Sequence, residues 1–236
     1  AMAAVEATAP PAYYLLNCAH PAHMLPAVAA LPAALRERIV GLRVNASRLS
    51  HAELDAAAQV MGASAAQLQP MKPWLAALSL SVAPLIKAGY DPKSGVELVL
   101  KARAEVAGKS IHGFETIDKQ IGILAGLPDD VQLAFLRETL KDYENAATKL
   151  DEMVEAWARG DVATLDRVTI TEMKEASPAL YQAILVDRNT DWANQIQTLL
   201  EGSGTAFIAV GAAHLTGDDS VQAILQKRGV TVEAAN

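Results

Sequence analysis

Two short apolar runs, one near each end of the chain, lead through a bend of small residues to a histidine. The C-terminal run is Ala206–Val210, and it leaves through Gly211-Ala-Ala-His214. The N-terminal run begins at Tyr13 and leaves through Asn17-Cys-Ala-His20. A continuous apolar run between turn residues is typical of a strand that helices cover on both faces. Two such strands with the same exit predict one sheet whose carboxyl edge carries both imidazoles.

Three further segments have the pattern of strands, and the long segments between them favour helices. The additional strands are expected at Arg38–Asn45, Gly108–Glu115 and Val230–Glu233. Half of the residues are hydrophobic but only 5% are aromatic, so alanine and leucine dominate, and both favour helix. A helix beginning near His51, after the Ser50/Glu53 capping pattern, belongs to a β-α-β start that implies a parallel pair of strands. We therefore predict an α/β fold with a central mixed or mostly parallel sheet flanked by many helices.

Length and charge limit the class of protein. A chain of 236 residues suits a single α/β domain, expected over residues 13–236, after an extended or disordered Ala/Pro-rich stretch at 1–12. A net charge of −7 argues against a nucleic-acid partner, and no apolar run is long enough to predict a membrane span. The first residues lack the pattern of an intact signal peptide. The single cysteine leaves bacterial periplasm and cytoplasm both open for a soluble protein. An edge strand at Val230–Glu233 makes a homodimer plausible.

Four side chains stand out as candidates for chemistry. His20 and His214 follow strands of the same shape, and Glu115 ends the strand expected at Gly108–Glu115. Arg188 interrupts an apolar helical stripe that includes Trp192. Histidine and carboxylate together can bind a divalent metal ion such as zinc, manganese or cobalt. Two simpler interpretations stay open: His214 only caps its loop, and Arg188 only lies along the surface with its charge in water.

The remaining histidines and the cysteine are expected to have structural positions. His23 and Cys18 lie near the first strand as spare ligands for which a structural role is favoured. His112 falls on an alternating strand so as to face away from the site, and His51 is expected at an exposed helix start.

Residues from about 65 to the end resemble the TraB/GumN family, which includes the Tiki proteins. The segments that carry the resemblance are Met71-Lys-Pro-Trp-Leu-Ala-Ala-Leu78, Ala88-Gly-Tyr-Asp-Pro92, Gly113-Phe-Glu-Thr116, Val186-Asp-Arg-Asn189 and Val210-Gly-Ala-Ala-His214. The resemblance implies a fold related to erythromycin-esterase-like and ChaN-like proteins and a metal-dependent hydrolase activity, like that of a protease. It implies a site with two Gly-x-x-His motifs and nearby acidic and arginine residues. Carried over by position, these are His214 in the second motif, Glu115 as the acid and Arg188 as the arginine.

The N-terminal quarter is similar to a different family. Residues 13–58, with Cys18 and His20, resemble the cysteine-bearing strand of homocysteine S-methyltransferases, and a fusion with a join near 55–65 is the interpretation we draw. Those enzymes bind zinc through further cysteines that this chain lacks, so methyl transfer by that route is excluded. In this arrangement His20 stands in for the first histidine of the TraB/GumN site. The acidic residue expected after the second strand is absent, because that strand ends in Asn45.

Three functions follow from these observations, in decreasing order of preference. The first is a metal-dependent hydrolase of a small-molecule or peptide substrate, with His20, His214 and Glu115 holding the ion and Arg188 stabilising an oxyanion or binding a carboxylate. The second is a catalytically incomplete relative that binds a small ligand or mediates assembly. The third is a methyltransferase remnant.

Overall fold

The computed structural model describes residues 14–19, 29–30, 32–33, 39–44, 55, 58–59 and 71–233. The chain divides into two compact units, Ala1–Leu80 and Ser81–Asn236, and the helix α6 (Pro73–Lys87) contains the boundary. Within the described residues, no helix combines the length and the apolar character needed to span a lipid bilayer. The stretch 1–12, residues 56–57 and 60–65 of the expected join, and His20, His23 and His51 lie outside the described residues.

At the positions of the first two expected strands, the first unit has a small pair. The strands are β1 (Tyr14–Ala19) and β2 (Ile39–Val44), and they pair in parallel, with Tyr14 opposite Ile39 and Ala19 opposite Val44. The pairing is irregular on either side of Leu15–Asn17, where the register shifts. A parallel pair needs a crossover connection, and the segment between the two strands is long enough to supply one.

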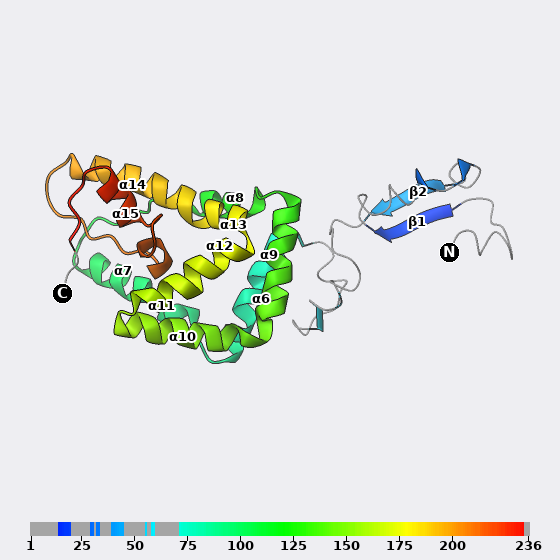
Figure 1. Ribbon diagram of the computed structural model, residues 1–236, viewed down its shortest axis with the longest axis horizontal. Coiled ribbons are helices and arrows are strands. Elements are labelled where there is room, and N and C mark those ends of the chain that lie inside the picture. The colour runs from blue at the N-terminus through cyan, green and yellow to red at the C-terminus, as the bar shows by residue number, and fades with distance from the viewer. Residues whose placement is uncertain are drawn as a thin grey trace. The chain divides into compact units, whose positions relative to one another are not determined.

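The second unit is helical. Its α-helices are α7 (Val96–Val106), α8 (Ile117–Ala125), α9 (Asp129–Asp142), α10 (Ala146–Arg159), α11 (Val162–Asp166), α12 (Glu172–Ala176), α13 (Pro178–Tyr181), α14 (Asp187–Leu200) and α15 (Val221–Lys227). Short 3₁₀ segments are η1 (Pro92–Ser94), η2 (Tyr143–Asn145) and η5 (Ala212–Leu215), whereas η3 (Arg167–Thr171) and η4 (Gln182–Val186) are π-helical. Because η3 and η4 continue their neighbours without a break, residues 162–176 and 178–200 form two long helical rods (Figure 1).

Short polar side chains fix where several of these helices begin. Thr116 accepts a hydrogen bond from the Lys119 amide at the start of α8, and Asp161 accepts one from the Thr164 amide at the start of α11. Ser177 caps α13, with Pro178 at the first helical position, where its missing N–H costs nothing. Each of these three starts follows the sequence pattern of a short polar residue directly before a helix.

The predicted α/β fold is wrong. No strand is present in residues 71–233, so no central sheet forms there. The segments expected as strands at Gly108–Glu115, Ala206–Val210 and Val230–Glu233 are extended or turn-like without ladder pairing, and Phe207 is 81% exposed. An apolar run can adopt a strand only if another strand satisfies its backbone, whereas each alanine- and leucine-rich helix satisfies its own. Side chains of these segments instead contact the helices.

The core that supports the candidate site lies between α14 and α15, which run side by side in Figure 1. Trp192 and Ala193 of α14 are buried against Val221 and Leu225 of α15. The partly buried residues packed against this group include Phe114, Val210 and Val230 from the three extended segments. A second buried group joins the two long rods through Ile170, Tyr181 and Leu185.

Candidate functional site

The first turns of α14 present three neighbouring side chains to the segment before α8 and to η5. Arg188 and Trp192 are four residues apart and are therefore neighbours on the helix surface, and Asn189 directly follows Arg188 in the chain. Asn189 is 2% exposed and Trp192 is 6% exposed. Because Trp192 is anchored in the core, the side chains beside it have a fixed platform.

Arg188 and Glu115 form a two-pronged ion pair. Arg188 Nε donates to both carboxylate oxygens, at 3.0 and 3.1 Å, and Nη2 donates to Oε2 at 2.8 Å. The side chain of Glu115 is 1% exposed and that of Arg188 is 18% exposed. Burial acts to raise the pKa of Glu115, but the hydrogen bonds and charge of Arg188 outweigh it and hold that pKa below its usual value. Glu115 is therefore a carboxylate at neutral pH.

His214 lies on η5 with its ring held from both sides. Its Nδ1 is 2.6 Å from Asn189 Oδ1, and its Nε2 is 3.5 Å from Arg188 Nη1. The ring packs on Trp192 with centroids 4.4 Å apart, and the Arg188 guanidinium lies 4.8 Å from the same indole. The three predicted residues Glu115, Arg188 and His214 therefore meet in one cluster.

The hydrogen bonds of Asn189 determine which nitrogen of His214 carries the proton. Asn189 Nδ2 donates to the backbone carbonyl of Asp219 at 2.7 Å, which turns Oδ1 toward the imidazole. A carbonyl oxygen can only accept, so Nδ1 must be the protonated nitrogen. Nε2 then keeps its lone pair, and it faces Arg188 Nη1 only at the outer limit of a hydrogen bond.

The imidazole is neutral over the whole physiological range. Burial and, to a smaller extent, the positive charge of Arg188 lower the pKa of His214 to about 4, against the opposing effect of the Glu115 carboxylate. A neutral ring with a free Nε2 lone pair is the form of histidine that binds metals.

The described residues supply part of the predicted metal site. Among them, no group of three or more His, Cys, Asp or Glu side chains is arranged to hold a metal ion. His214 fits as a ligand through Nε2, but both oxygens of Glu115 accept hydrogen bonds from Arg188. His20, the predicted third ligand, lies outside the described residues, and Cys18 is described only as part of β1. His112 lies on an exposed part of its segment.

A small cavity opens beside the ion pair. It has a volume of about 200 Å³ and is lined by Gln120, Ile123, Leu124, Ile184 and Arg188. Its wall is thus aliphatic, with the guanidinium at one point. Gln120 also reaches Glu115 Oε2 at 3.4 Å, so α8 contributes to both the cavity and the cluster.

Sequence reasoning singled out the charged members of the cluster and missed the role of Asn189. The residue lies directly after Arg188 and carries neither charge nor a metal-binding preference, so nothing in its type marked it. The available signal was an asparagine inside a helix, next to an arginine in a mostly apolar stripe, where a buried amide needs partners for its donors and its acceptor.

A histidine, an arginine and a glutamate gathered against a buried tryptophan define a compact polar site in a helical unit. The chain belongs to the TraB/PrgY/gumN family, whose model matches residues 29–234. A relative is an uncharacterized protein of Treponema pallidum (strain Nichols), 26% identical over 194 residues that cover 77% of this chain and 58% of the relative. The chain thus spans less than two thirds of that relative's length. No solved structure matches the chain.

The comparisons do not support the expected fusion. The family match begins at residue 29 and continues across the expected join near 55–65, and nothing relates residues 13–58 to homocysteine S-methyltransferases. A short strand followed by a bend and a histidine is a pattern that many parallel-strand units share, because it reflects backbone geometry more than ancestry.

Proposed function

We propose that the protein is a metal-dependent hydrolase of a peptide or small-molecule substrate, and that the reactive atom of His214 is Nε2. The observation that carries this proposal is the hydrogen bond between His214 Nδ1 and Asn189 Oδ1, because it leaves a lone pair on Nε2. Membership of the TraB/PrgY/gumN family gives the site its context. Histidines that bind metals are commonly oriented in this way, with the second nitrogen donating to a fixed oxygen.

The low basicity of His214 favours a ligand over a general base. A base works best when its pKa is near the working pH, and the pKa of His214 is about 4. A metal ligand needs only a neutral ring with a lone pair, and at neutral pH no proton has to leave His214 before an ion binds. His214 is therefore better suited to bind an ion than to accept a proton from water.

The companions proposed for His214 are Glu115 and His20. When bound, a divalent ion such as zinc, manganese or cobalt supplies a water molecule acidified enough to act as nucleophile near neutral pH. Glu115 is ionised at neutral pH, as a ligand must be, but one of its oxygens has to leave Arg188 to take part.

Arg188 is the residue proposed to contact the substrate. Glu115 fixes the Nε and Nη2 side of its guanidinium, while Nη1 faces the His214 ring. A donor held in this way can stabilise an oxyanion or bind a carboxylate without reorganising during the reaction. The cavity beside it, with Ile123, Leu124 and Ile184, offers room for a small aliphatic group of the substrate.

One observation favours the second candidate, a catalytically incomplete relative that binds a small ligand. Arg188 and Glu115 already satisfy each other, so neither needs an ion for neutrality. The missing acidic residue at Asn45 points the same way. The two functions differ in whether a metal is bound.

Metal content of the purified protein separates the two candidates. Elemental analysis is made on the unaltered chain and on His214→Ala, His20→Ala and His112→Ala, the last being an exposed histidine that serves as the matched control. The hydrolase proposal expects about one ion per chain in the unaltered protein and in His112→Ala, and loss of that ion in the other two variants. Hydrolysis of a mixed peptide library, followed by mass spectrometry, should fall with the metal. A metal-free protein that hydrolyses nothing would overturn the proposal in favour of the ligand-binding candidate.

A further inference from the structure

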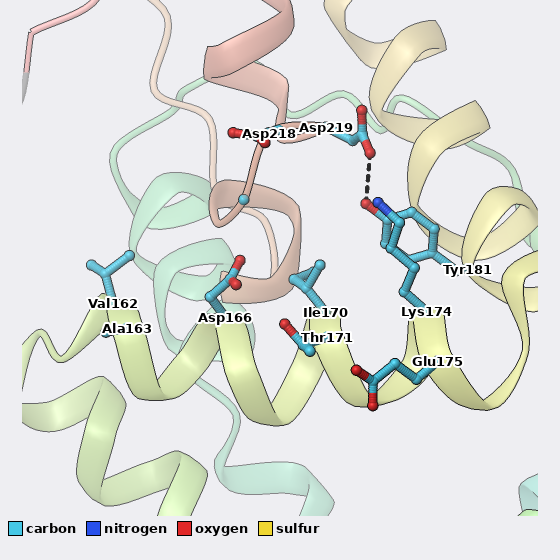
Figure 2. A pocket seen from close by; sticks show the side chains of 11 residues that line it. Val162, Ala163, Asp166, Ile170, Thr171, Lys174, Glu175, Tyr181, Asp218 and Asp219 are labelled. Carbon is cyan, nitrogen blue, oxygen red and sulfur yellow. Dashed lines mark hydrogen bonds between the residues drawn. The ribbon is translucent and has the colours of Figure 1, made fainter.

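A groove separate from the His214 cluster runs along one face of the first long rod. It has a volume of about 720 Å³, which is within the range of small-molecule sites. One wall is formed by Val162, Asp166, Ile170 and Lys174, at successive spacings of four residues (Figure 2). Because an α-helix rises about 1.5 Å per residue, this wall is about 18 Å long. The loop Gly217–Asp219 and Tyr181 form the opposite side.

The groove combines an aliphatic surface with a strong excess of negative charge. Val162, Ala163 and Ile170 supply the apolar surface. The groove is lined by four carboxylates and one ammonium group, so three negative charges have no positive charge to balance them among the lining residues at pH 7. The carboxylates are those of Asp166, Glu175, Asp218 and Asp219, and the ammonium is that of Lys174. A groove that is long, partly aliphatic and acidic is complementary to an extended aliphatic cation.

The groove carboxylates lack the partners that acids elsewhere on the same rod have. Glu172, on the same rod, pairs with Lys149 at 3.1 Å and with Arg167 at 3.3 Å. Within residues 71–233, none of the four groove carboxylates forms an ion pair. Oδ1 of Asp166 is buried and has no hydrogen-bond partner in that part of the chain. A buried carboxylate oxygen without a donor is costly, and a cation in the groove would supply that donor.

The groove already accommodates one ammonium group. Lys174 Nζ lies 5.3 Å from the centre of the Tyr181 ring, a cation–π distance. Tyr181 in turn donates from its hydroxyl to Asp219 Oδ2 at 2.8 Å, the bond drawn in Figure 2. The aromatic end of the groove is therefore occupied by an ammonium. At the other end Lys227 Nζ donates to the backbone carbonyl of Asp218 at 2.8 Å, and no cation among the described residues pairs with the carboxylates of Asp166 and Asp218.

We propose that this groove binds a linear aliphatic polyamine, with ammonium groups at Asp166 and Asp218 and methylenes along Val162, Ala163 and Ile170. Two or more ammonium groups on one aliphatic chain match the uncompensated charges on the two sides of a long groove better than a single compact cation does. The absence of a three-ligand cluster in the described residues agrees with an organic cation over a metal ion. The proposal does not depend on the hydrolase function, because no groove residue belongs to the His214 cluster.

Calorimetric titration of the full chain with spermidine at low salt tests the proposal. We expect saturable binding of one spermidine per chain, with butylamine, which has one ammonium group, at least about tenfold weaker. Asp166→Asn and Asp218→Asn should each weaken spermidine binding by about fivefold or more. Asp218 is exposed, so its variant keeps the fold even if the Asp166 variant does not. Glu201→Gln removes the same charge from an exposed position just after α14 and should leave the affinity unchanged.

Three results would overturn the proposal. They are the absence of saturable heat with spermidine, an equal loss of affinity in Glu201→Gln, and tighter binding of a trilysine peptide than of spermidine. The second would mean a diffuse effect of net charge, and the third would assign the groove to a basic protein segment.

Discussion

The His214 cluster and the acidic groove share one loop and treat their polar groups in opposite ways. Residues 214–219 supply the imidazole to the cluster and Asp218 and Asp219 to the groove. In the cluster, Arg188, Glu115, Asn189 and His214 satisfy one another through short contacts. The groove is lined by four carboxylates and a single ammonium group.

The cluster and the groove differ in whether their polar side chains form hydrogen bonds and ion pairs with one another. A cluster whose members hold each other is rigid before any substrate arrives, and such preorganisation suits chemistry. A groove with an excess of carboxylates gains stability from a cation that enters it, which suits binding. Removing one member should therefore be costly in the cluster and nearly free in the groove.

The largest effect is expected from removing Arg188. Arg188→Leu leaves Glu115, with a side chain that is 1% exposed, as a buried carboxylate without its cation. Breaking a buried pair in this way costs about 3–5 kcal/mol of unfolding free energy, measured by urea denaturation at pH 7.

The double variant Arg188→Leu/Glu115→Leu is the matched control, because it removes the stranded charge. It should recover much of the lost stability. A single variant as stable as the unaltered chain would show that the cluster is not held by this pair.

Acid is expected to weaken the fold through His214. Its pKa is lowered from 6.5 to about 4 in the folded protein, so the unfolded chain binds more protons between these values. The stabilisation is complete above about pH 6.5 and is lost as the pH falls toward 4, by up to ~3 kcal/mol. Glu115, whose pKa is also lowered, contributes in the same direction at lower pH.

Urea denaturation at several pH values measures this loss. His214→Asn, which cannot gain the proton, should show a flatter dependence on pH between 4 and 6.5. An unchanged slope in that variant would mean that groups other than His214 cause the acid sensitivity.

The smallest effect is expected at Tyr181, which connects the two regions. Its hydroxyl donates to Asp219, and the backbone carbonyl of Asp219 holds Asn189. Tyr181→Phe removes one hydrogen bond and should cost about 1 kcal/mol of unfolding free energy. Because Asp219 is held at its backbone as well, the His214 tautomer should persist, with Nδ1 protonated in ¹⁵N NMR spectra. A change of tautomer would show that the two regions are coupled more closely than the contrast suggests.

The hydroxyl also reports on the charge of the groove. Burial, the bond to Asp219 and the nearby charges of Asp219, Asp166 and Asp218 raise the pKa of Tyr181 to about 12. That is the direction expected for a phenol that faces several uncompensated carboxylates.

The residues of the candidate site could be predicted from the sequence better than the fold could. Glu115, Arg188 and His214 were identified because their charges or ring nitrogens are conspicuous among apolar neighbours, and the structure brings all three together. Helix starts at Thr116, Asp161 and Ser177 were also predictable, because a cap depends on only a few adjacent residues. These features are local.

The sheet failed as a prediction because strands depend on partners far away in the chain. Ala206–Val210 has the composition of a buried strand, yet Phe207 is almost fully exposed and only Val210 packs on the core. The composition of a segment indicates that it can form a strand, but a strand forms only where another segment pairs with its backbone. Asn189 was missed for a related reason, since its role comes from Asp219 and His214, both more than twenty residues away.

The π-helical turn η4 has a consequence for insertions and deletions. A π-turn holds one residue more than an α-turn, so it rotates everything after it by about 100° around the helix axis. Gln182–Val186 stands directly before Arg188 and Asn189 and thereby sets which side of the rod they occupy. Deleting one residue from this turn would let it close as an ordinary α-turn, so Arg188 and Asn189 would keep their side of the rod and still face Glu115 and His214. The π-turn is thus the point between Tyr181 and Arg188 at which the chain can lose one residue without moving the site.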